Sequence, residues 1–61
     1  MKRYTAVIYY YENNEYCVTE ETRFSKESAL AWINTIKEYA DKKGIHIIGA
    51  EIETHEIEKI F

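Results

Sequence analysis

Two consecutive asparagines, Asn13 and Asn14, separate two runs of residues that favour β-structure. The first run, Arg3–Tyr11, is rich in β-branched and aromatic residues, which pack well on a pleated surface. Asparagine tolerates the positive φ that a type I′ turn requires at both of its central positions. The sequence therefore predicts a β-hairpin whose second strand runs from Glu15 to about Phe24.

The next segment carries the start and stop signals of a helix. Ser25 is a favoured N-cap residue, and Gly44 can adopt the left-handed conformation that ends a helix. Between them a stripe of apolar residues recurs at helical spacing: Ala29, Trp32, Ile33, Ile36 and Ala40. A helix over Lys26–Lys43 is predicted, with this stripe facing the core.

A third strand is predicted from Ile45 to about Ile57, with Gly49 as a candidate bulge. The residues after Glu56 could continue this strand or form a terminal helical turn. A right-handed crossover through the helix would place the third strand beside the first. We therefore expect an α+β fold of order ββαβ, a single domain over residues 1–61. It has a three-stranded, mainly antiparallel sheet of order 2-1-3 and one helix packed on one face.

The position of the turn predicts which hairpin residues share a face, because side chains alternate along a strand. One set contains Tyr4, Ala6, Ile8, Tyr10, Cys17, Thr19, Glu21 and Arg23. The other contains Thr5, Val7, Tyr9, Tyr11, Tyr16, Val18, Glu20, Thr22 and Phe24. Phe24 and Ala29 occupy the positions of a hydrophobic staple, which predicts that the second set lies under the helix.

Both sets contain aliphatic and aromatic side chains, and one helix cannot cover both faces of the sheet. Exposed apolar patches usually mark interaction sites. The predicted interface comprises Tyr4, Ala6, Ile8, Tyr10 and Cys17, with Leu30 beside the helical core stripe. The alternative is that the six tyrosines stabilise an exposed sheet through cross-strand pairs, without any partner.

A chain of 61 residues lies near the lower size limit of independent folding. Cys17 is the only cysteine, so disulfides cannot help, and no Cys/His cluster has the spacing of a structural metal site. Oligomerisation is the common remaining solution, and we expect a homodimer. A lone thiol, an N-terminus without an apolar segment and the lack of a membrane-length apolar run predict a cytoplasmic protein with no membrane contact.

The sequence contains no recognisable catalytic or cofactor-binding motif. His46 and His55 fall on opposite faces of a regular strand, and Cys17 has no base that the sequence places beside it. Two glycines are too few for a glycine-rich phosphate loop. We therefore expect a non-enzymatic protein with no catalytic residues, no metal ligands and no cofactor.

The charge balance ranks the partners of such a domain. Eleven acidic residues against eight basic ones give a net charge of −3, and the basic residues are scattered, which disfavours nucleic acid. A run of glutamates could instead meet a basic protein surface, although a solvated face has the same pattern: Glu51, Glu53, Glu56 and Glu58.

The chain resembles two groups of proteins, and each resemblance implies a candidate function. In size and charge the chain is similar to the small accessory proteins of phages and mobile elements, several of which inhibit host proteins. The segment from Phe24 to Trp32 resembles the strand-to-helix junction of the arm-type DNA-binding domains of tyrosine recombinases. The first expectation is thus a protein-interaction domain that acts as an inhibitor or regulator. The alternatives are a nucleic-acid-binding accessory domain and a structural module that binds only itself.

Overall fold

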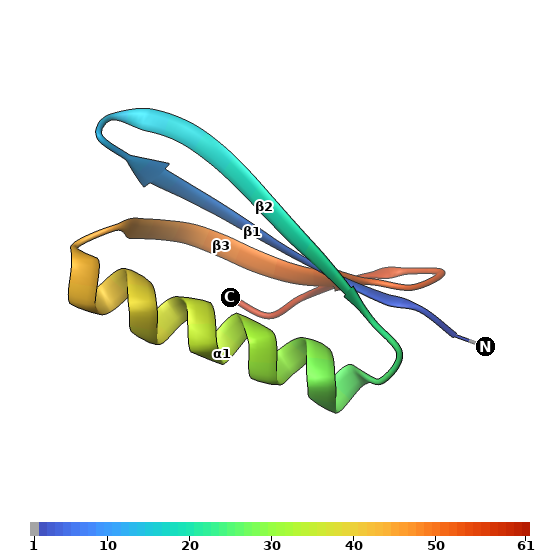
Figure 1. Cartoon of the computed structure of the whole chain (residues 1–61). Helices are drawn as coiled ribbons and strands as arrows, with labels where there is room; N and C mark the ends of the chain where they lie inside the picture. The colour runs from blue at the N-terminus through green and yellow to red at the C-terminus, as the bar shows by residue number, and fades with distance from the viewer. Residues whose placement is uncertain (1) are drawn as a thin grey trace.

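The computed structural model describes residues 2–61, in which one helix covers one face of an antiparallel sheet (Figure 1). The strands are β1 (Tyr4–Glu12), β2 (Glu15–Arg23), β3 (His46–Glu53) and β4 (Ile57–Lys59), and the helix α1 (Lys26–Lys43) connects β2 to β3. The sheet has the order β2-β1-β3-β4. This confirms the α+β fold and the order of the first three strands, and it adds a short fourth strand at the edge beside β3.

The β1–β2 hairpin closes at the predicted turn. Asn13 and Asn14 have φ values of 52° and 65°, as a type I′ turn requires. Glu12 pairs with Glu15 beside the turn, and the pairing continues without a bulge as far as Tyr4 and Arg23. The asparagine pair therefore sets the register of the whole hairpin.

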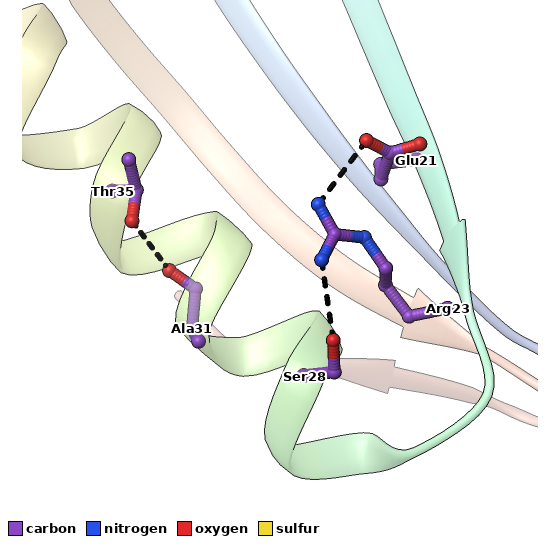
Figure 2. A network of polar contacts seen from close by, with 5 residues as sticks. All are labelled: Glu21, Arg23, Ser28, Ala31 and Thr35. Atoms are coloured by element: carbon purple, nitrogen blue, oxygen red, sulfur yellow. Dashed lines mark hydrogen bonds and ion pairs between the residues drawn. The ribbon is translucent and has the colours of Figure 1, made fainter.

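Both predicted caps of α1 are formed. The Ser28 amide donates to the Ser25 hydroxyl at 3.1 Å, and Gly44 adopts the left-handed conformation with φ of 71°. At the same junction the Arg23 guanidinium donates to the Ser28 hydroxyl at 3.2 Å and lies 3.3 Å from the Glu21 carboxylate (Figure 2). The figure also shows Thr35, whose hydroxyl donates to the Ala31 carbonyl one turn earlier. Arg23 thus links the end of β2 to the first turn of the helix.

The core lies between α1 and the face of the sheet that the sequence analysis assigned to the open side. It contains Ala6, Ile8, Ala29, Ile33, Ala50 and Ile52. Ala6 and Ile8 are 0% exposed, whereas Phe24 is 64% exposed and does not hold the predicted staple. The assignment of the two hairpin faces was therefore wrong.

The physical reason lies in the pairing of β1 with β3. Ala6 and Ile8 lie opposite Ile52 and Ala50, so four apolar side chains form one continuous surface for the helix. The small alanines let the helix approach the sheet closely, whereas a layer of tyrosines would hold it away. In the other hairpin set, Thr5 and Val7 lie opposite Glu53 and Glu51 of β3 instead, and this set remains on the uncovered face.

The third strand, β3, contains a bulge and ends earlier than predicted. The pairing with β1 shifts between Tyr9 and Tyr10, which confirms a bulge next to Gly49 and leaves Ile48 exposed. The chain then turns over residues 54–56 and returns as β4, so the prediction of one strand as far as Ile57 was wrong. A Cβ atom on Gly49 would lie 3.0 Å from the Phe61 carbonyl oxygen, so glycine accommodates the returning chain.

Candidate interaction surface

The face of the sheet opposite α1 is covered by no element of residues 2–61, and we call it the open face. By strand register it carries Thr5, Val7, Tyr9, Tyr11, Tyr16, Val18, Glu20, Thr22, His46, Glu51, Glu53, Ile57 and Lys59. Along β2 these residues are exposed, while most of the alternate ones that face the helix side are half-buried: Cys17, Thr19, Glu21 and Arg23. The molecule therefore has one sheet face packed on the core and one that faces solvent.

Aromatic and aliphatic side chains gather at the hairpin end of the open face. Tyr11 lies opposite Tyr16, and Tyr9 lies opposite Val18. The rings of Tyr11 and Tyr16 meet edge to face, with centroids 5.7 Å apart and an interplanar angle of 63°. Tyr11, Tyr16 and Val18 are 45%, 57% and 50% exposed. We call Tyr9, Tyr11, Tyr16 and Val18 the tyrosine patch.

A hydrogen bond fixes the orientation of Tyr9 within this patch. Its hydroxyl donates to the Glu51 carboxylate on β3. This bond to Glu51, with a smaller effect of burial, raises the pKa of Tyr9 to about 12, because loss of the proton would place two negative charges side by side. Tyr9 is therefore held as a neutral donor, and its ring is presented in a defined position.

Carboxylates follow the tyrosine patch along the open face. Val7, which is 9% exposed, lies between Glu20 on β2 and Glu51 on β3, and Glu53 is opposite Thr5. Lys59 on β4 lies opposite Glu51. The surface thus combines an aromatic half near the hairpin turn with an acidic half beside it.

The six residues predicted as an interface lie on the helix side instead. Ala6 and Ile8 are buried, while Tyr4, Tyr10 and Leu30 are half-buried against the core cluster. Cys17 is also half-buried, and its thiol contacts the Glu15 carbonyl oxygen at 3.6 Å. The structure therefore brings these residues together as core and core margin.

An open groove of about 230 Å³ lies on the helix side, between α1 and the hairpin. Its walls are mostly apolar and include Ile8, Tyr10, Ile36 and Tyr39, with Glu12 as the one carboxylate. Ligand pockets usually occupy about 300–1,000 Å³ and combine several convergent polar groups. The groove is smaller and carries few polar groups.

The two histidines lie near opposite ends of β3. His46 begins β3, and His55 is in the turn between β3 and β4. Within residues 2–61 no group of three histidine, cysteine, aspartate or glutamate side chains could hold a metal ion. In the same part of the chain, no helix has both the length and the apolar character needed to cross a bilayer.

Comparisons with known protein families, curated proteins and solved structures give no match for this chain.

The open face was predicted on the wrong hairpin set because that prediction depended on a single expected contact, the staple of Phe24. A better signal is the alternation of Ala50 and Ile52 with Glu51 and Glu53, which assigns the two faces of β3. The faces of β3 determine the faces of the hairpin only when the register between β1 and β3 is known. That register is a tertiary property of the chain.

Proposed function

We propose that this protein is a non-enzymatic protein-interaction domain that binds its partner through the open face. The observation that carries the proposal is the tyrosine patch, an exposed aromatic cluster on the sheet face that no element of residues 2–61 covers. Tyrosine is enriched at protein interfaces because its ring buries a large area while its hydroxyl keeps a hydrogen-bonding partner. A patch of this kind favours a protein partner over a small molecule.

The partner that fits best presents a basic surface. Glu20, Glu51 and Glu53 stand next to the tyrosine patch on the open face. Complementary charge at the rim of an interface speeds association and selects between partners. In this proposal the domain occupies a basic surface on its target, as a phage-type inhibitor or regulator does.

We also propose that the domain works as a homodimer in the cytoplasm. The homodimer is supported by the small size of the chain, which has one cysteine and therefore no internal disulfide. The location in the cytoplasm, a reducing compartment, is supported by the free thiol of Cys17.

The test compares three forms of the tagged protein in extracts of the native host. The first is the parent protein, the second carries Tyr11→Ser, Tyr16→Ser and Val18→Ser, and the matched control carries Ala31→Ser, Asn34→Ser and Glu38→Ser. The control residues are exposed on α1. Bound proteins are quantified by mass spectrometry.

We expect the parent and the control to capture the same protein, one with a basic surface. The patch variant should capture about tenfold less of this protein, since aromatic residues usually dominate the binding energy of interfaces. Capture should also weaken as salt is raised, because the rim contacts are ionic. Equal capture by the patch variant, or no specific capture by the parent, would overturn the proposal.

A further inference from the structure

The outer edge of the sheet at β2 has no partner strand. β2 is the first strand in the order β2-β1-β3-β4 and spans nine residues, whereas the opposite edge strand, β4, spans three. Among residues 2–61, no backbone hydrogen bond outside the β1–β2 ladder involves β2. One edge of the sheet is therefore long and open.

The hairpin register identifies which backbone groups point away from β1. Beside a two-residue turn, the flanking residues Glu12 and Glu15 exchange hydrogen bonds, and every second residue along β2 then does the same. The amides and carbonyls of the residues between them point outward: Tyr16, Val18, Glu20 and Thr22. The same alternation on β3 sends the amide and carbonyl of Ala50 outward, where they bond to Phe61 and Ile60.

This edge lacks several of the features that prevent strands from pairing. Natural proteins protect an open edge with charged side chains, especially lysine, with proline, a bulge or a very short strand. β2 contains no proline and no lysine, and its register with β1 is unbroken, although it carries the charged residues Glu15, Glu20, Glu21 and Arg23. Tyr16 and Val18, which carry two of the outward-pointing backbone groups, also have exposed side chains. The edge can therefore accept another strand.

We propose that β2 pairs with β2 of a second copy in an antiparallel arrangement, around a two-fold axis at Thr19. The occupant is a second copy because the sequence of β2 complements itself in this register. Val18 then lies opposite Glu20, Tyr16 opposite Thr22, and Glu15 opposite Arg23. The first two pairs use the outward-pointing backbone groups, and the third pair joins opposite charges at both ends of the interface.

Neighbouring registers are less favourable. A two-fold axis perpendicular to the sheet places residues of the same face opposite each other, so the axis must pass through a residue. An axis at Val18 would place Glu15 opposite Glu21, and an axis at Glu20 or Glu21 would place a glutamate opposite its own copy. Like charges that face each other across strands destabilise the pairing. Thr19 is the centre that pairs the full strand without such a conflict.

This dimer joins two four-stranded sheets into one of eight strands, with both helices on the same side. The two open faces become continuous, so two tyrosine patches point in the same direction. This dimer rests on the proposed function, because the homodimer is part of that proposal. The edge of β2 is the additional element, as the surface through which the two copies meet. A partner with two basic sites would gain affinity from the paired patches.

The decisive experiment reverses the charges at the ends of β2. Glu15→Arg and Arg23→Glu each place two like-charge pairs in the interface, and we expect each variant to weaken dimerisation by roughly tenfold. An equimolar mixture of the two variants restores both opposite-charge pairs in the mixed dimer, and the double variant restores them in its own dimer. Sedimentation equilibrium at tens of micromolar measures all forms against the 7.3 kDa monomer mass.

Recovery of the dimer in the mixture and in the double variant would support the register. Single variants that dimerise as well as the parent, or a mixture that stays monomeric, would overturn it. Arg23 also contacts Ser28, so the fold of each variant is checked by circular dichroism.

Val18→Pro provides a second test that leaves the ion pairs in place. It removes one outward amide that the β1–β2 ladder does not use, so the monomer should fold while the dimer dissociates. A parent protein that sediments as a monomer would refute the homodimer altogether. A parent dimer that survives Val18→Pro would refute only this edge, and the capture experiment tests partner binding through the open face separately.

Discussion

The hydroxyl of Tyr9 on β1 donates a hydrogen bond to the carboxylate of Glu51 on β3, at the boundary between the tyrosine patch and the acidic part of the open face. In the strand register Glu51 lies opposite Val7, whereas Tyr9 lies opposite Gly49, so the bond runs diagonally between the two strands. It ties the central strand to β3 on the side that no helix supports. The two halves of the open face are therefore physically linked.

This bond predicts that Tyr9 loses its proton at a higher pH than an ordinary tyrosine. The pKa of Tyr9 is about 12, above the ordinary value of about 10. The folded state therefore holds the proton more tightly than the unfolded state. The resulting contribution to stability is complete below about pH 10 and is lost as the pH rises toward 12.

Absorbance titration of tyrosinate checks this expectation. The late phase should vanish in Tyr9→Phe and move to lower pH in Glu51→Gln. Tyr10→Phe is the control, because the pKa of Tyr10 is also raised, mainly by desolvation. A late phase that is the same in the parent and in Glu51→Gln would mean that the bond does not form in solution.

The buried position of Ile8 predicts that Ile8→Glu unfolds the protein. Its side chain is 0% exposed in the core, and an unpaired carboxylate there costs several kcal/mol, comparable to the whole stability of a small domain. Val18→Glu is the matched control, since Val18 is on the exposed face of the neighbouring strand and its variant should stay folded. Thermal melts followed by circular dichroism separate the two. A folded Ile8→Glu protein would show that the faces of the sheet are reversed.

The helical stripe predicts a graded loss of stability. Ile33 is 0% exposed, so Ile33→Ala should lower the free energy of unfolding by about 2–4 kcal/mol. Ile36 is half-buried at the groove, so Ile36→Ala should cost less, about 1–2 kcal/mol. Urea denaturation gives both values. Equal losses, or none for Ile33→Ala, would contradict the packing of α1.

Weak binding to nucleic acid is expected because the cations are dispersed and several are engaged within the chain. Arg23 and Lys26 form ion pairs with Glu21 and Glu58, and Lys37 lies 4.9 Å from the centre of the Phe61 ring. The affinity for duplex or single-stranded DNA at about 0.15 M salt should be weaker than the roughly 10⁻⁴–10⁻⁶ M of non-specific binders. Fluorescence anisotropy measures it. A steeply salt-dependent micromolar isotherm would instead favour the nucleic-acid-binding alternative.

The turn and the helix could be predicted from sequence because their determinants are local. Asn13 and Asn14 adopt the positive φ values that their side chains tolerate, and Ser25 and Gly44 cap the helix at the expected residues. Each signal involves groups only a few residues apart. The chain therefore specifies these features before any long-range contact forms.

The choice of sheet face was decided only in the tertiary structure. Both sets of hairpin side chains are apolar enough to pack under a helix, so the alternation within the hairpin is ambiguous. The pairing of β1 with β3 resolves it, because Ala6 and Ile8 meet Ile52 and Ala50 while Val7 meets Glu51. The sequence by itself determined the hairpin, the helix and the order of the first three strands, whereas the turn after Glu53 and the short strand β4 appeared only in the structure. The register between β1 and β3, two strands that are distant in the chain, decided which tyrosines are exposed to solvent. This register buries apolar side chains on one face and leaves the glutamates solvated on the other.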